Sequence, residues 1–280
     1  RSYSVTGVQT CALPILWKLL DSRGKVMMEG RLPARDVAID NGQKLGVIRF
    51  ATRSLPAPAQ YRLVVAIENT LYENDWDLWV YPEQQQEQVP PDLMVTRALN
   101  ADAVAQLQRG GKVLWLVPPH HVRPDAKQGP IALGFSTIFW NTAWTRNQAP
   151  HTLGLLCDPK HPALHQFPTE YHSNWQWWYI VHGAAAMILN HLPVDVKPVV
   201  QVIDDWVTAR RLALAFEARV GAGRIFVCSV DWDQEAGRNP VLAQLRSSIL
   251  HYLAGSGFAP KEQATIEQLS TIVVDNSVKP

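Results

Sequence analysis

The chain has 280 residues, of which 47% are hydrophobic and 18% are charged, a composition that excludes a disordered or fibrous polypeptide. Lys and Arg number 26 against 25 Asp and Glu, so the charge gives no reason to expect nucleic acid or an anionic membrane as a partner. No apolar run reaches the roughly 18 residues of a membrane-spanning helix. The length favours about two domains.

The N-terminal segment Val5–Ile15 reads VTGVQTCALPI and looks like the translation of a sequencing adapter. It has no hydrophobic period, and it joins abruptly to a patterned strand at Leu16. We therefore expect an artefact here, with the natural chain beginning upstream, and leave the segment out of fold reasoning. The alternative is a real N-terminal arm with frayed structure.

Residues 16–82 have the pattern of an antiparallel β domain. Apolar and polar side chains alternate along several segments, and turn signals such as Ser22-Arg23-Gly24 and Asn41-Gly42 separate them. The predicted strands lie within residues 16–21, 25–32, 44–55, 61–70 and 74–82. About five strands at this spacing favour an immunoglobulin-like β-sandwich.

After a polar, Gln-rich stretch at residues 83–91, strand and helix patterns alternate. Apolar runs predict strands within residues 92–99, 112–119, 151–159, 198–206 and 211–232, the last being two strands joined through Gly221–Gly223. A helix is predicted at residues 101–109, capped by Asn100 or Asp102, and an amphipathic helix at residues 240–258. This order predicts a three-layer α/β domain with a mostly parallel sheet.

The expected organisation therefore has five parts. Residues 1–15 are an artefact or disordered, 16–82 a β-sandwich accessory domain, 83–91 a linker, 92–260 an α/β domain and 261–280 a tail. The alternative for the residues after Lys261 is the start of another element.

Metal and cofactor chemistry is not indicated. Cys11, Cys157 and Cys228 have neither disulfide-framework nor metal-ligand spacing. His161 and His165 are four residues apart, as ligands on a helix face would be, but no Glu follows His161 and Pro162 favours a helix start. We predict no metal site and no cofactor.

Three pairs of carboxylates, Asp75/Asp77, Asp204/Asp205 and Asp231/Asp233, lie at strand ends. Paired acids suit glycoside hydrolysis, but aspartates also form turns and caps at such positions, and we favour that structural role. A Gly-x-Ser-x-Gly nucleophile elbow is absent from the sequence. The residues therefore predict no catalytic site.

An aromatic cluster is the most unusual segment. Residues 167–183 read FPTEYHSNWQWWYIVHG, in which Trp177 and Trp178 must point in different directions on a helix or a strand. Exposed aromatic faces beside amide and imidazole groups are typical of a sugar site. The candidate sugar-binding residues are His172, Asn174, Trp175, Trp177 and Trp178. The alternative is packing of the indoles against another domain.

Six segments together resemble the C-terminal part of bacterial glycoside hydrolase family 2 proteins of the β-galactosidase-like, sugar-binding-domain type. They are ENTLYENDWDLWVYP, LQRGGKVLWLVPP, FSTIFWNTAW, LGLLCDPKHPALHQFPTEYHSNWQWW, VVQVIDDW and LAFEARVGAGRIFVCSVDW, and they span most of residues 60–258. The resemblance implies an all-β accessory domain followed by a non-enzymatic domain similar to the class I glutamine amidotransferase fold.

The resemblance also carries functional expectations. The family's acid/base belongs to an Asn-Glu pair in a (β/α)8 barrel, and this sequence has no Asn-Glu dipeptide. We expect a non-catalytic C-terminal fragment of an exo-acting glycoside hydrolase that braces a missing upstream barrel or borders its sugar cleft. The partners would be carbohydrate, through the intact enzyme, and a possible second copy of the chain, in a periplasmic or secreted setting.

Two other functions stay open at this point. One is a stand-alone carbohydrate-binding or interaction module. The other is an independent hydrolase with a new site around His120, His121 and Asp204.

Overall fold

The computed structural model divides the chain into two compact units, residues 1–82 and 83–280. It describes residues 12–36, 41–83, 89–135, 151–205, 208–233 and 239–274. The protein is a mixed α/β chain with two open sheets, one in each unit. Within the described residues, no helix is long and apolar enough to cross a bilayer.

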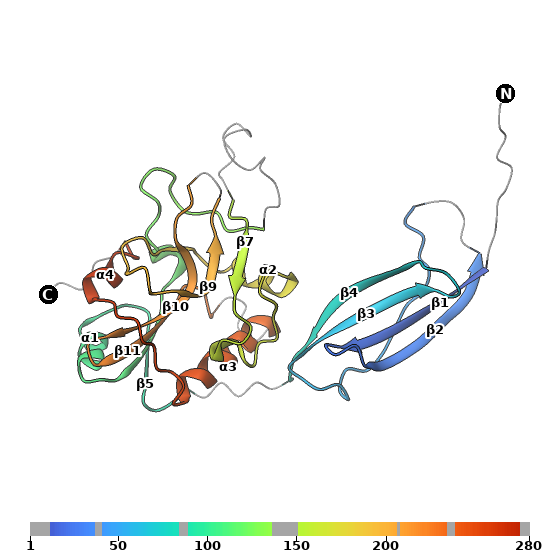
Figure 1. Cartoon of the computed structure of the whole chain (residues 1–280), viewed down its shortest axis with the longest axis horizontal. Helices are drawn as coiled ribbons and strands as arrows, with labels where there is room; N and C mark the ends of the chain where they lie inside the picture. Colours follow the sequence, from blue (N-terminus) through green and yellow to red (C-terminus); the bar gives the residue numbers. More distant parts are fainter. Residues whose placement is uncertain are drawn as a thin grey trace, which may run out of the picture. The chain divides into compact units, whose positions relative to one another are not determined.

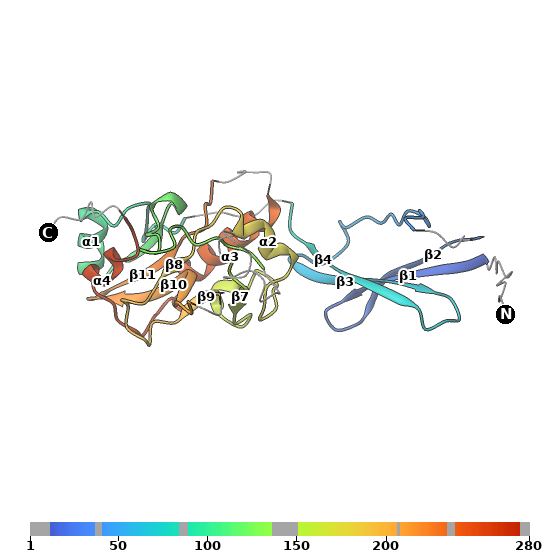
Figure 2. The same cartoon turned by 90° about the horizontal axis from the view of Figure 1, so that it is seen from above.

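The first unit is a twisted antiparallel sheet (Figures 1 and 2). Its strands, in the spatial order β2-β1-β3-β4, are β1 (Ala12–Asp21), β2 (Val26–Asp36), β3 (Ala59–Ile67) and β4 (Glu73–Val80). Alternation of apolar and polar residues places one face of each strand on a small core formed by Leu19, Leu55 and Tyr61. The Tyr61 hydroxyl donates to the Pro56 carbonyl at 2.7 Å, which ties the preceding segment to the sheet.

The strand expected at residues 44–55 is not formed. This segment has no regular structure, yet Leu55 is buried and Phe50 stacks on Trp17 with ring centroids 5.8 Å apart. Leu55 and Phe50 therefore cover part of the sheet as an irregular layer, because burial requires contact with the sheet face and not strand pairing, whereas Leu45 and Val47 stay exposed. Among the described residues of this unit, all strands belong to one sheet.

The first strand also begins earlier than Leu16. β1 starts at Ala12, and Ile15 pairs with Leu32 on one side and Ile67 on the other. Residues 12–15 therefore belong to the sheet, contrary to the boundary expected at residue 15. Residues 5–11 of the adapter-like segment lie outside the described residues.

The second unit contains a seven-stranded sheet (Figure 1). Along the sheet the order is β5-β6-β11-β10-β9-β7, and β8 pairs with β10. The strands are β5 (Leu93–Thr96), β6 (Lys112–Leu116), β7 (Gly154–Cys157), β8 (Met187–Ile188), β9 (Pro198–Ile203), β10 (Leu212–Val220) and β11 (Gly223–Cys228). The helical elements are α1 (Ala101–Gln108), η1 (Pro119–His121), η3 (Pro162–Leu164), α2 (Trp175–Val181), α3 (Pro240–Ala254) and α4 (Ile266–Ser270).

The sheet is mixed, so the expectation of a mostly parallel sheet was wrong. Only β5/β6 and β6/β11 pair in parallel, whereas β11/β10, β10/β9, β9/β7 and β10/β8 are antiparallel. A two-residue hairpin at Gly221-Ala222 reverses the chain between β10 and β11. Continuous apolar runs indicate burial on both faces, and burial does not specify strand direction.

Helices cover both faces of this sheet. Ala103 and Leu107 of α1 and Leu269 of α4 share a core with Trp115 and Phe216 on one face. On the other face, Tyr252 of α3 contacts the Phe226 ring, and the Lys112 ammonium donates to the Leu253 carbonyl. Of the two predicted caps of α1, Asn100 is the one that caps it, and Pro240 occupies the first turn of α3 as expected. Asn239, for which no role was predicted, caps α3.

Residues 261–274 are not the tail assigned to residues 261–280 but belong to the alternative, a further structural element. They include α4, whose N-terminus has a capping box between Thr265 and Gln268. Leu269 and Ile272 are fully buried in the core that also holds α1. The five residues of α4 are too few to show a helical period, which is why the sequence pattern did not predict this helix.

Candidate functional site

The aromatic cluster forms the short helix α2, which is anchored by its inward side chains. The Asn174 side chain accepts the backbone N–H of Gln176 and caps the helix. Trp177 is fully buried, meets the Phe167 ring edge-on at 5.1 Å, and donates from its indole N–H to the Thr169 hydroxyl at 2.8 Å. The cap, the ring contact and the hydrogen bond hold α2 against the rest of the second unit in one orientation.

Three aromatic side chains lie on the outward face of α2. Trp175 is 71% exposed, Tyr179 57% and Trp178 39%. Their spacing of three and four residues places them on one side of the helix. Trp178 meets Phe135 edge-on at 5.6 Å and His182 at 4.6 Å, so two neighbouring rings hold its indole in place. We call Trp175, Trp178 and Tyr179 the aromatic face.

The structure separates the five predicted sugar-binding residues. Trp175 and Trp178 lie together on the aromatic face. Trp177 has no exposed ring surface and therefore leaves the set, as a correction to the prediction. Asn174 uses its side chain as the helix cap and in a bond to Glu170. His172 is exposed, but it precedes the helix and lies beside the edge strand β7, where it bridges to Leu156.

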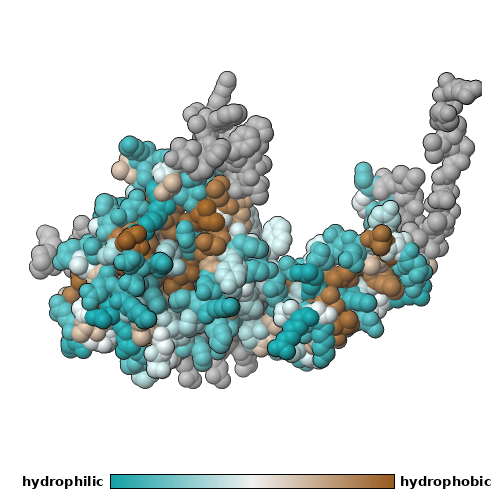
Figure 3. Space-filling view, in the orientation of Figure 1, coloured by the Kyte–Doolittle hydropathy of each residue, from teal (hydrophilic) through white to brown (hydrophobic). Residues whose placement is uncertain are grey.

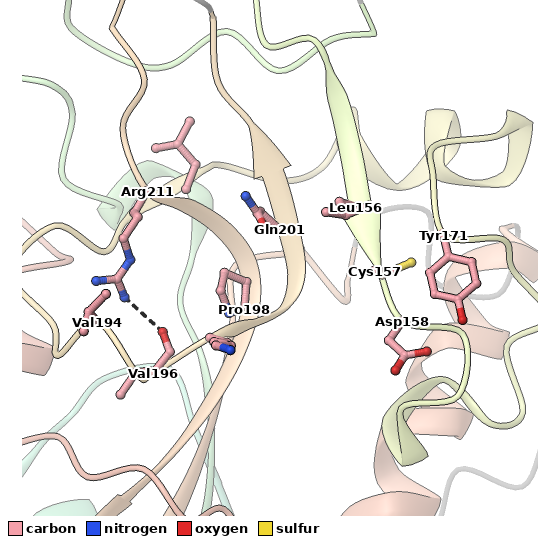
Figure 4. A pocket seen from close by; sticks show the side chains of 11 residues that line it. Leu156, Cys157, Asp158, Tyr171, Val194, Val196, Pro198, Gln201 and Arg211 are labelled. Atoms are coloured by element: carbon pink, nitrogen blue, oxygen red, sulfur yellow. Dashed lines mark hydrogen bonds between the residues drawn. The ribbon is translucent and has the colours of Figure 1, made fainter.

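A pocket of about 460 Å³ opens on the sheet next to this segment (Figure 4). It is lined by Leu156, Cys157, Asp158, Tyr171, Val194, Val196, Lys197, Pro198, Gln201, Arg211 and Leu212. Tyr171 comes from the start of the aromatic segment, and its carbonyl accepts the backbone N–H of Cys157 at 3.0 Å. In Figure 4, Leu156 points from β7 toward Gln201, while Arg211 and Val196 lie on the opposite side of the pocket.

The floor of this pocket is a patch of the sheet where β7 and β9 pair. Leu156 pairs with Gln201 across β7 and β9, so both side chains lie on the same face, as does Ile203 two residues further on. Leu156 is 45% exposed and Ile203 38%. Figure 3 shows hydrophobic surface over β7 and β9 in this unit. The pocket is thus lined both by apolar side chains such as Leu156 and by polar side chains such as Gln201.

Arg211 forms a wall of the pocket. Its guanidinium donates to the carbonyls of Leu192 at 3.1 Å, Pro193 at 3.1 Å and Val196 at 2.9 Å. These three bonds hold the segment that carries Val194 and Val196 against β10. The charge of Arg211 therefore stabilises the pocket's shape.

The cysteines are unsuited to nucleophilic catalysis. Burial raises the pKa of the Cys157 thiol to about 11 and that of Cys228 to about 11. Both are protonated at neutral pH, and the thiolate is the reactive form.

Each pair of carboxylates has structural partners. Arg62 forms ion pairs with Asp75 at 3.3 Å and Asp77 at 3.7 Å. In the third pair, Asp231 accepts the backbone N–H of Asp233 at 3.0 Å, and the Asp233 carboxylate bonds to the Arg97 guanidinium. These contacts agree with the structural role expected from the sequence.

The pair Asp204/Asp205 belongs to a buried ion cluster. The Arg210 guanidinium makes a two-pronged contact with Asp204 at 2.8 and 2.9 Å and approaches Asp125 at 3.2 Å and Asp205 at 3.5 Å. Burial by itself raises the pKa of Asp204, but the bonds from Arg210 outweigh burial and hold the pKa below its usual value. At neutral pH Asp204 is therefore an anion paired with Arg210.

The histidine candidates do not converge. His120 and His121 lie on η1 with ring centroids 4.3 Å apart, and in the described part of the chain no hydrogen bond or ion pair joins either to Asp204. His161 caps η3 through its ring nitrogen, and the described residues hold no group of three or more His, Cys, Asp or Glu arranged for a metal ion.

Sequence reasoning found the aromatic segment but missed the pocket beside it. The pocket's polar groups, such as Lys197, Gln201 and Arg211, come from segments separated by tens of residues from Tyr171. None of them lies in a recognisable motif. The one available signal was the polar Gln201 inside the apolar run of residues 198–203.

The comparisons with known proteins follow the division into two units. The profile of a family described as "Domain of unknown function (DUF8488)" matches residues 8–82, a range that includes part of the adapter-like segment. A search of curated proteins finds no match. The profile of a second family, described as "Domain of unknown function (DUF8487)", matches residues 94–274. Because this match spans well over half of the chain, the protein belongs to the DUF8487 family.

Proposed function

We propose that this chain is the non-catalytic C-terminal part of an exo-acting, β-galactosidase-like glycoside hydrolase and that its second unit contacts carbohydrate. The observation that carries the carbohydrate contact is the aromatic face of α2, where Trp175, Trp178 and Tyr179 are exposed together. The resemblance of residues 60–258 to glycoside hydrolase family 2 proteins carries the link to the enzyme.

The aromatic face has the chemistry that sugar binding requires. A flat ring packs against the C–H face of a pyranose, and rings on one rigid helix are ordered before the ligand arrives, which lowers the entropic cost of binding. The buried Trp177 and the cap at Asn174 supply that rigidity. The imidazole of His182, against Trp178, and the hydroxyl of Tyr179 supply polar groups for sugar hydroxyls.

The finer fold assignment is part of the same proposal. An immunoglobulin-like first domain and a second domain similar to the class I glutamine amidotransferase fold would suit an accessory region. Antiparallel strand pairing in the first unit and a sheet with helices on both faces in the second support it. The described strands of the first unit form one sheet, on which Leu55 and Phe50 pack in place of a second sheet. The proposed role of such an accessory region is to brace a catalytic barrel or to border its sugar cleft.

Glycan titration of the 280-residue chain tests the carbohydrate contact. We expect galactosides or their oligomers to change tryptophan fluorescence and to give saturable heat in calorimetry. Trp175→Ala and Trp178→Ala should each weaken binding by about 1–3 kcal/mol, the usual cost of losing one stacked ring. Trp76→Ala is the matched control, because Trp76 is a 48% exposed indole in the first unit. Equal losses in all three variants, or no binding of any glycan, would refute the proposal.

The non-catalytic part of the proposal has its own assay. The purified chain should not hydrolyse aryl-glycosides, because its paired carboxylates are engaged by arginines or by backbone amides. A contaminating glycosidase can be controlled for by removing the metal it needs or by adding its inhibitor. Turnover that persists under those conditions would show a catalytic site in this chain. The alternative function, a stand-alone carbohydrate-binding module, would be favoured if this chain alone bound glycan as tightly as the intact enzyme.

A further inference from the structure

A second pocket, of about 430 Å³, lies in the second unit and shares no aromatic residue with α2. Its polar lining includes His161 at the start of η3 and Glu217 on β10. Pro198, Val199, Ala259 and Pro260 supply apolar surface, and Asp195, Lys197, Lys261 and Glu262 complete the lining. The side chains of His161 and Glu217 are 25% and 17% exposed, so both face a partly enclosed space.

The hydrogen-bond partners of His161 determine which of its nitrogens carries the proton. The backbone N–H of Ala163 donates to Nδ1 of His161 at 3.2 Å, so Nδ1 is an acceptor. In a neutral imidazole the hydrogen is then on Nε2. Burial lowers the pKa of His161, which keeps the ring neutral at pH 7. His161 therefore presents an N–H donor from Nε2.

Glu217 presents the complementary acceptor. The Tyr252 hydroxyl donates to Oε2 of Glu217 at 2.8 Å and holds the carboxyl group in place. Its other oxygen, Oε1, lies 3.9 Å from Nε2 of His161. That separation is too long for a direct hydrogen bond. A fixed donor and a fixed acceptor thus stand side by side without bonding to each other.

A hydroxyl group fits between these two atoms, because it is the common group that donates and accepts through one oxygen. An oxygen at about 2.8 Å from both atoms can donate to Oε1 and accept from Nε2. We propose that this pocket binds a small neutral polyol, of monosaccharide size, through a hydroxyl held between His161 and Glu217. The inference rests on this pocket and not on the aromatic face.

The remaining lining favours a neutral ligand over an anion. Two lysines, Lys197 and Lys261, are balanced by Asp195 and Glu262 at the same pocket. Glu217 then leaves the pocket with one net negative charge, which disfavours an anion, while the proline and valine surfaces match the C–H groups of a polyol. The volume lies within the usual range of small-molecule sites.

Two conservative variants remove one partner each. Glu217→Gln keeps the volume and an oxygen for Tyr252, but it places an amide donor where the ligand needs an acceptor. His161→Asn keeps an oxygen that can cap η3 and removes the Nε2 donor. Asp102→Asn is the matched control, because it neutralises an exposed carboxylate of the same unit outside this pocket.

Saturation-transfer NMR and calorimetry with glucose, galactose and myo-inositol test the inference on the full 280-residue chain. We expect saturable, millimolar binding of at least one probe, about tenfold weaker in Glu217→Gln and in His161→Asn and unchanged in Asp102→Asn. Thermal unfolding of each variant checks that the fold is intact. No saturable binding, or binding that neither variant weakens, overturns the inference and indicates a bridging water only.

A Trp175→Ala arm separates this inference from the proposed function. Loss of binding in Trp175→Ala with full binding in Glu217→Gln would overturn the pocket and leave the aromatic face supported. The reverse result would support the pocket and count against the aromatic face.

Discussion

One helix supports a sharp test, because α2 places adjacent tryptophans in opposite environments. Trp177→Ala removes a fully buried indole that contacts Phe167 and donates to Thr169. Truncating a buried Trp costs about 3–5 kcal/mol of folding free energy. For a domain of this size each kcal/mol lowers Tm by roughly 2–4 °C, so we expect the second unit to melt roughly 6–20 °C lower.

Trp175→Ala is the matched variant with the opposite expectation. Trp175 is 71% exposed, and substitutions at such positions change stability by no more than about 0.5 kcal/mol. Trp177→Phe should fall between the two, because it keeps a ring against Phe167 and loses the bond to Thr169. Urea unfolding followed by circular dichroism, with calorimetry for Tm, measures all three. Equal destabilisation by Trp175→Ala and Trp177→Ala would refute the division of α2 into a buried anchor and an exposed face.

Three further predictions concern the framework of the second unit. Asp204→Asn should destabilise it by about 1–3 kcal/mol in urea unfolding at pH 7, because Arg210 loses its two-pronged partner. The folded-state pKa of Asp204 is lowered, so this difference is present above its ordinary pKa and shrinks as the pH falls through the lowered value; a pH-independent difference would contradict the ion pair. Gly223→Ala should cost about 1–3 kcal/mol, because a Cβ there would lie 2.4 Å from the Leu107 carbonyl oxygen, and an unchanged Tm would refute that close approach. Thr265→Ala should cost about 1 kcal/mol through loss of the capping box, whereas a neutral result in calorimetry would mean that α4 adds nothing to the fold.

The candidate site was predictable only in part. The sequence indicated that Trp177 and Trp178 must diverge, and the helix indeed directs one inward and the other outward. Which of them is buried depends on Phe167 and Thr169, and on the Asn174 cap that sets where the helix begins. The contacts with Phe167 and Thr169 are tertiary, and the Asn174 cap sets the phase of the helix. The spacing of residues in the sequence therefore does not predict which tryptophan is buried.

The two pockets could not be predicted at all. His161 and Glu217 are 56 positions apart in sequence, and only the packing of η3 beside β10 and α3 brings them within 3.9 Å. A donor and an acceptor that meet in this way leave no local motif.

Features under local control could be predicted from the amino-acid sequence: the Asn100 cap, the Gly221-Ala222 hairpin and the amphipathic pattern of α3. Each depends on residues within a few positions of one another, so backbone sterics and short-range hydrogen bonds decide them. The directions of the strands, the irregular layer at residues 44–55 and the place of α4 in the core became known only from the folded structure. Those features depend on which distant surfaces bury one another, because hydrophobic burial is non-directional and is settled by the whole chain at once.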